Sequence, residues 1–103
     1  MFDRWVEGDY LTLFHVDRPV TVDITRVFPP PVARKDELPL GLKASGLWLE
    51  PHMIGRQIAW LRRADGEWLA CVQMPASSAN KRSKLLMTLW LPPHAFAVEA
   101  PKL

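Results

Sequence analysis

The chain has 103 residues, of which 49% are hydrophobic and 23% are charged, and its formal net charge is +2. These proportions are typical of one globular domain with one hydrophobic core, and they argue against a disordered chain. The longest strongly apolar run, residues 85–91, is far shorter than the ~20 residues of a membrane helix, so we expect no membrane span.

The placement of cysteine and charge indicates a cytoplasmic protein. The only cysteine, Cys71, excludes an internal disulfide and is consistent with a reducing compartment. Charged residues within the first nine positions leave no apolar core for a signal peptide. Residues 47–103 hold seven Lys or Arg and four Asp or Glu, which makes this part of the chain mildly basic.

The first third of the chain predicts two strands joined in a hairpin. Residues 10–16 and 20–28 each alternate between apolar and polar side chains, as strands with one buried face do. Residues 17–19, Asp-Arg-Pro, predict the turn between them. Three consecutive prolines at 29–31 then end the second strand.

The next segment is less regular. Residues 32–46 predict an irregular connection, and one short helical turn over residues 38–44 is compatible with the sequence although a proline and a glycine within it oppose a helix. Residues 47–50 then predict a short strand that ends at Pro51.

Two apolar runs around Asp65 and Gly66 give the clearest structural signal in the chain. Asp-Gly between such runs is typical of a hairpin turn, since glycine takes a positive φ without steric strain. The sequence therefore predicts one strand over residues 57–63 and a second over residues 67–74.

The register of this hairpin depends on the length of its loop. A two-residue loop would place Arg63 opposite Trp68, whereas a three-residue loop would place Arg62 opposite Trp68 and Arg63 opposite Glu67. We favour the three-residue loop, because it sets a guanidinium against an indole and opposite charges across the ladder. This register also sorts the other side chains into two faces, which hold Leu61, Leu69, Ala59 and Cys71 on one side and Ile58, Trp60, Ala70 and Val72 on the other.

The last part of the chain predicts a loop and two more strands. Residues 76–83 are small, polar and basic, as in a surface loop. Residues 84–91 are apolar on both faces, which predicts a central strand covered on both sides. Residues 94–99 predict a short last strand after a Pro-Pro turn, and residues 100–103 predict a tail.

About six strands without a sustained helix predict an all-β fold in a single domain that spans residues 1–103. A chain of this size would form a small antiparallel barrel or a compact sandwich. Residues 55–72 begin with a glycine and continue through Asp65 and Gly66 to Trp68, a small residue and Val72. This stretch, about 18 of the 103 residues, resembles the central part of SH3-like barrels, the Tudor type in particular. The resemblance favours an SH3-like barrel and implies a non-enzymatic module that binds methylated side chains or nucleic acids.

No group of residues predicts catalysis. The three histidines lack the spacing of zinc ligands. Cys71 stands among apolar strand residues, which predicts a buried thiol instead of a nucleophile. Ser77 and Ser78 precede basic residues that could grip a phosphate, but their loop lacks the glycines of a phosphate cradle, so a linker loop is favoured. We expect no enzymatic activity, no cofactor and no metal.

Five tryptophans are more than the core of a small barrel needs. Trp48, Trp60 and Trp90 lie in apolar strands and are expected in the core. Trp5 and Trp68 have charged neighbours and are expected at an interface.

Two functional hypotheses follow. In the favoured one, the protein is a non-enzymatic interaction or adaptor module that binds a protein partner or a second copy of itself through a Trp-rich β surface. Its candidate partner-binding residues are Trp5, Arg62, Arg63 and Trp68. In the alternative, the basic C-terminal half binds nucleic acid, and the hairpin arginines are joined by Arg56, Lys81, Arg82 and Lys84. An accessory protein of a phage or another mobile element would fit either hypothesis.

Overall fold

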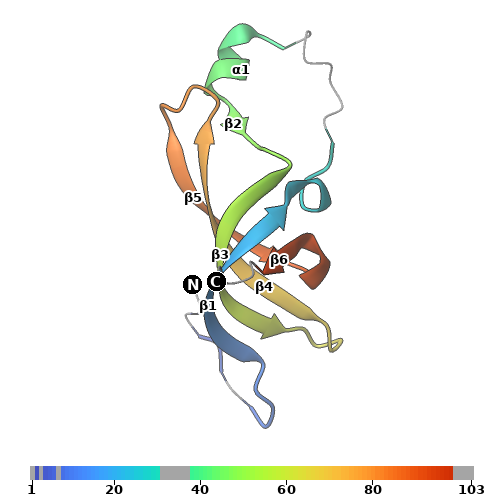
Figure 1. Ribbon diagram of the computed structural model, residues 1–103. Coiled ribbons are helices and arrows are strands. Elements are labelled where there is room, and N and C mark those ends of the chain that lie inside the picture. Colours follow the sequence, from blue (N-terminus) through green and yellow to red (C-terminus); the bar gives the residue numbers. More distant parts are fainter. Residues whose placement is uncertain (1, 3, 7, 31–37, 99–103) are drawn as a thin grey trace, which may run out of the picture.

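The computed structural model describes residues 2, 4–6, 8–30 and 38–98, and its centre is one antiparallel sheet of six strands (Figure 1). The strands are β1 (Leu13–Asp23), β2 (Leu47–Trp48), β3 (His52–Arg62), β4 (Trp68–Ser78), β5 (Lys84–Leu91) and β6 (Phe96–Val98). A short helix, α1 (Leu40–Ser45), precedes β2, and 3-10 turns follow β1 (Ile24–Arg26) and β5 (Pro93–Ala95).

Strand β1 lies between β3 and β6, and β4 lies between β5 on one edge and both β3 and β2 on the other. The predicted all-β class and antiparallel arrangement of about six strands are confirmed. The sheet is not closed into a barrel, so the choice between a barrel and a sandwich stays a prediction. The predicted tail and the first part of the predicted irregular connection lie outside the described residues.

The hairpin of β3 and β4 has the favoured three-residue loop. Arg62 is paired with Trp68, and the Arg63 N–H donates to the Glu67 carbonyl at 2.7 Å. Gly66 takes a φ of +89°, which is the conformation that selects glycine here. The Arg63 guanidinium bonds to Asp65 at 2.6 Å instead of reaching across to Glu67.

The predicted first hairpin is wrong, because residues 17–19 do not turn the chain. Strand β1 runs through them without interruption and pairs along its length with β3, with a register shift between His15 and Arg18. The Asp-Arg-Pro segment lies at this irregularity in the ladder, and a proline is tolerated at such a position. The strand also ends earlier than predicted, in a 3-10 turn capped by Asp23, which accepts hydrogen bonds from the Thr25 N–H and hydroxyl at 3.2 and 2.6 Å.

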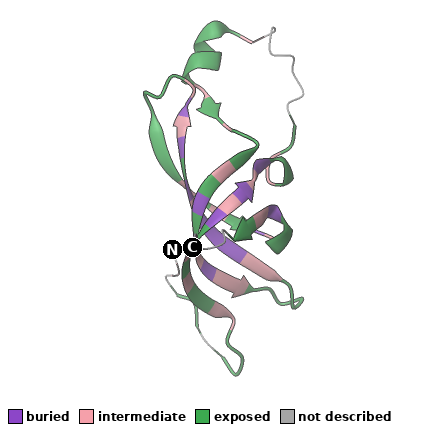
Figure 2. Ribbon diagram, in the orientation of Figure 1, coloured by how far each residue is buried: buried purple, intermediate pink, exposed green. Residues whose placement is uncertain are grey.

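The core occupies the middle of the sheet (Figure 2). Alternate residues of β4 face inward and are buried against β1, β5 and the second 3-10 turn. The buried cluster consists of Val20, Val22, Ile24, Ala70, Val72, Met74, Leu91 and Ala95. Trp60 packs against this cluster, as predicted, and is only partly buried.

The opposite face of the sheet is covered in the same region by the N-terminal segment. His15, Ala59, Cys71 and Trp90 are neighbours across four strands. The Phe2 ring lies edge-on to both ends of this row, 5.5 Å from His15 and 5.9 Å from Trp90. Cys71 is therefore fully buried beneath it, as predicted, and burial raises the pKa of its thiol.

Strand β5 is not the central strand that its sequence predicted. In the described part of the chain it pairs with β4 alone, which makes it an edge strand. Trp90 and Trp48, both expected in the core, are 39% and 47% exposed. An apolar pattern on both faces fits a buried central strand and an uncovered edge strand equally well, so the pattern could not distinguish them.

Candidate interaction surface

The sheet splits at Gln73, and a groove lies in this split. Pairing between β3 and β4 ends at Arg56 and Gln73, and β2 pairs with β4 only at Ser77 and Ser78. Between these points the described chain places no strand against that edge of β4. Beyond the split, the first part of β3 follows β1 and the last part of β4 follows β5 (Figure 1).

Pro75 explains why the ladder stops there. The Ser78 N–H donates to Ser83 on the β5 side, and the Ala79 N–H donates to Gly46 on the β2 side. Because backbone groups alternate along a strand, odd residues of β4 present their N–H groups toward β3 and β2. Pro75 would be the next donor after Gln73, and it has no N–H.

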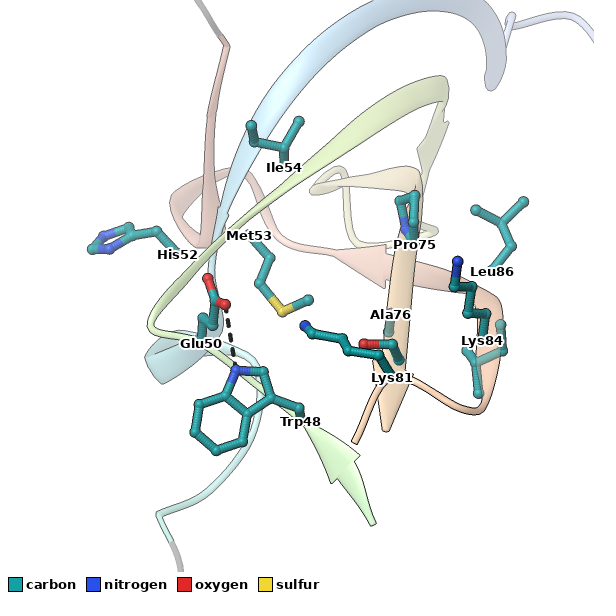
Figure 3. A pocket seen from close by; sticks show the side chains of 12 residues that line it. Trp48, Glu50, His52, Met53, Ile54, Pro75, Ala76, Lys81, Lys84 and Leu86 are labelled. Carbon is teal, nitrogen blue, oxygen red and sulfur yellow. Dashed lines mark hydrogen bonds between the residues drawn. The ribbon is translucent and has the colours of Figure 1, made fainter. Parts of the chain in front are cut away.

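The groove in this split has a volume of about 560 Å³ (Figure 3). Residues from β2, β3, β4 and β5 line it. They include the apolar side chains of Trp48, Met53, Ile54, Pro75, Leu85 and Leu86 and the charged side chains of Glu50, Lys81 and Lys84. The Trp48 indole N–H donates to Glu50 at 3.3 Å, which fixes the ring at the lower rim in Figure 3.

Apolar side chains gather around the groove without cover. Ile54 is 67% exposed, Leu85 54% and Leu86 56%, and Leu40, Leu42 and Leu47 of the neighbouring α1 and β2 are exposed too. We call this region, formed by α1, β2, residues 52–54, residues 75–78 and residues 84–86, the open half. The remainder of the sheet, which holds the buried cluster, is the closed half.

A structured turn carries the basic residues at the end of the open half. Ser78 and Asn80 hold it: the Ser78 hydroxyl bonds to Asn80 Oδ1 at 2.7 Å and accepts from the Ser83 N–H at 3.0 Å. Asn80 also donates its N–H to Ala44 of α1 at 2.8 Å. Lys81 takes a φ of +66° in this turn. Lys81, Arg82 and Lys84 are exposed on a defined turn, which replaces the predicted linker loop.

The opposite end of the sheet holds most of the predicted partner-binding residues. The Arg62 guanidinium stacks over Trp68 at 5.4 Å, and Trp68 packs against Phe14 and Trp60. These aromatic rings and Pro93 line a small apolar slot of about 300 Å³. Trp68 is therefore half-buried in an aromatic cluster.

Other predicted residues have local partners. The Trp5 indole N–H donates to the Thr12 hydroxyl at 3.1 Å, and the ring remains 47% exposed. Arg56 forms an ion pair with Asp17 at 2.6 Å. Such exposed pairs contribute little to stability.

The predicted basic residues do not form one surface. Arg62 and Arg63 lie at the hairpin tip, whereas Lys81, Arg82 and Lys84 follow the other end of β4. Strand β4 has 11 residues, which separates the two groups by about 35 Å.

The open half was not predictable from the apolar pattern. Trp48 was expected in the core, and Leu85 and Leu86 were not among the expected partner-binding residues. One signal was present: Pro75 lies in a strand that otherwise reads as central, and a proline within a strand favours an edge whose N–H side has no partner.

The described residues contain no cluster suited to a metal ion. No three His, Cys, Asp or Glu side chains among them come close enough together to hold a metal ion. Within the same residues, no helix is long and apolar enough to cross a membrane. The groove is thus defined by shape and apolar surface, which are properties suited to binding.

In comparisons with known proteins, no family model matches this sequence, and no curated protein or solved structure is significantly similar to it.

Proposed function

We propose that this chain is a non-enzymatic protein-interaction module and that the open half is its binding surface. The proposal keeps the class of function favoured by the sequence, binding to a protein partner or to itself through a β surface that carries tryptophan. It relocates the centre of that surface from the Arg62–Trp68 tip to the groove around Trp48.

One observation carries the proposal. Leu85 and Leu86 are consecutive residues of a strand, so their side chains point to opposite faces of the sheet. Both are more than half exposed. The start of β5 therefore has apolar side chains in contact with water on both faces, and a partner protein would remove these unfavourable contacts.

The total surface supports the same proposal. By the usual scaling with mass, a compact monomer of 11.8 kDa exposes about 5,900 Å². This chain exposes 7898 Å². The excess of about 2,000 Å² is larger than the roughly 800 Å² that one partner buries in a protein–protein interface of standard size.

Nucleic-acid binding remains the second candidate, supported by the turn that presents Lys81, Arg82 and Lys84. These side chains are exposed together beside an apolar groove, and stacking on Trp48 could accompany phosphate contacts. The separation of this turn from Arg62 and Arg63 shortens the basic surface and weighs against this candidate.

Light scattering on the purified protein at low and high salt, with absorbance recorded at 260 and 280 nm, tests the proposal. We expect an oligomer whose mass does not change with salt and which carries no nucleic acid, because apolar interfaces are insensitive to screening. A monomer that co-purifies with material absorbing at 260 nm, and releases it at high salt, would overturn the proposal in favour of nucleic-acid binding.

A further inference from the structure

Strand β5 is an exposed edge without the usual protection. Proteins protect edge strands with charges, prolines or short length, since an open ladder pairs readily with another chain. Residues 85–91 of β5 contain no charge and no proline. Seven consecutive uncharged residues, six of them apolar, make this edge a template for another strand.

The backbone groups that face the open edge can be assigned. The Ser78 N–H donates to the Ser83 carbonyl across the β4–β5 turn, so even residues of β4 bond to odd residues of β5. Even residues of β5 therefore direct their N–H and C=O groups away from β4. Leu86, Thr88 and Trp90 present these groups at the open edge.

The other edges of the sheet are far less suited to pairing. Strand β6 has three residues and follows a Pro-Pro turn, and β2 has two residues. Short strands and nearby prolines both disfavour pairing with a strand of another chain. A partner strand of matching length is available in one place that the structure describes, which is β5 of a second copy.

We infer that two copies of this chain pair through β5, antiparallel and about a two-fold axis at Thr88. The inference rests on one part of the proposed function, binding to a second copy, and the β5 edge that it uses meets the open half at residues 84–86. In this register Thr88 lies opposite the partner's Thr88, and Leu86 lies opposite the partner's Trp90. About six backbone hydrogen bonds form between the edges, since each of these pairs exchanges two.

This register is the one that pairs the whole apolar run with itself. Its centre, Thr88, is the midpoint of residues 85–91. Lys84 falls beyond the run, so no like charges face each other across the axis. A two-fold axis perpendicular to the sheet keeps the outer faces on the same side, and the exposed Leu86 gains an aromatic neighbour. The contact is closed, which limits assembly to a dimer.

A cysteine at the axis tests the register. In Thr88→Cys, the two Cα atoms would lie about 5.5 Å apart, within the range of about 4.4–6.8 Å that a disulfide spans. In the matched control Leu86→Cys, the two cysteines would lie about 14 Å apart and cannot bond. Under mild oxidation we expect about tenfold more covalent dimer from Thr88→Cys than from Leu86→Cys. The buried Cys71 of the unmodified chain should form none.

A charge at the axis tests the interface itself. Thr88→Lys would place two ammonium groups opposite each other and should weaken self-association about tenfold, whereas Thr88→Val should leave it unchanged. Sedimentation velocity over a concentration series gives the dissociation constants. Circular dichroism verifies that Thr88→Lys is folded. If Thr88→Lys does not fold, the cross-linking of the cysteine variants still tests the inference.

The outcomes separate this inference from the proposed function. A salt-insensitive dimer that persists in Thr88→Lys, without cross-linking of Thr88→Cys, would overturn β5 pairing and leave the interaction module standing. Assemblies larger than a dimer, in which Thr88→Cys cross-links to Ala97→Cys instead of to itself, would show that β5 pairs with β6 and would also overturn the inference. A monomer at all concentrations would overturn it, and co-purified nucleic acid would overturn the proposed function as well.

Discussion

The two halves of the hairpin formed by β4 and β5 differ in what covers them, although β5 carries apolar side chains in both. In the closed half, β4 has β1 and a 3-10 turn on its inner face and Phe2 over its outer face, and both Val72 and Cys71 are fully buried. In the open half, the same two strands continue with Leu85 and Leu86 in water. Burial in this protein is therefore decided by which segments cross a strand.

The largest effect should come from equal truncations in the two halves. Met74→Ala removes a fully buried side chain and should lower the free energy of unfolding by about 2–5 kcal/mol. Leu86→Ala should change it by no more than about 0.5 kcal/mol, since that side chain is already exposed. Urea denaturation in a Thr88→Lys background, which we expect to be monomeric, measures both. Equal losses would show that the open half is covered within one chain.

A methyl group at the split should have the next largest effect. A Cβ on Gly55 would lie 2.9 Å from the Gln73 carbonyl oxygen and 2.9 Å from the Val72 side chain. Gly55→Ala should therefore destabilise the protein by about 1–3 kcal/mol. Gly41 of α1 has open space around it, and Gly41→Ala should stabilise by a few tenths to about 1 kcal/mol. Thermal unfolding of the two variants should shift in opposite directions, and a stable Gly55→Ala would contradict the close approach.

The buried side-chain amide of Gln57 should contribute to the stability of the closed half. Gln57 is fully buried, accepts a hydrogen bond from Arg18 Nε at 2.8 Å and donates to the Ala59 carbonyl at 3.1 Å. Gln57→Leu removes both hydrogen bonds from a buried position and should lower the free energy of unfolding by about 1–3 kcal/mol. Gln73→Leu, on the half-buried outer face, is the control and should stay within about 0.5 kcal/mol. Similar free energies of unfolding for the two variants would show that the Gln57 hydrogen bonds make no net contribution to stability.

The smallest effect concerns the cover over Cys71. Burial raises the pKa of this thiol above its ordinary value of 9.0. The folded state thus binds the proton more tightly than the unfolded state, so stability from this group is complete below pH 9 and decreases as the pH rises through the folded pKa. Comparing unfolding of the unmodified chain and Cys71→Ala at pH 7 and pH 10 isolates this contribution. An identical pH dependence in both would mean that the thiol is solvated.

The parts of the fold that depend on neighbours in the sequence were predictable. The loop of the β3–β4 hairpin and the register beside it could be derived to the residue, because the turn chemistry and the pairing of Arg62 with Trp68 are local. The strand bounds could not, since both strands are longer than predicted, and β3 has a register shift between Gln57 and Ala59. Strand β1 could not, because its uninterrupted path depends on β3, whose paired residues lie 29 to 48 positions further along the chain. Without that distant partner, Asp-Arg-Pro is a reasonable turn.

The candidate site was less accessible to prediction for the same reason. Trp48 and Leu86 have the apolar character of core residues, and only the three-dimensional arrangement shows that no described segment covers them. Partner binding was predicted instead for residues with charged neighbours. Two of these, Arg62 and Arg63, form their bonds within their own hairpin. A side chain's type indicates what it can contact, whereas its exposure is a property of the whole fold.

The missing N–H of Pro75 has a consequence for the order in which the strands assemble. A hairpin with a tight turn forms within microseconds and grows outward from its turn. Growth of the β3–β4 ladder from Gly66 would stop at Gln73, because the next donor is absent. The first residues of β3 would then stay unpaired until β1 arrives through a much longer chain closure, which is slower. A single proline thus leaves residues 52–55 of β3 for a partner strand that reaches them later in folding.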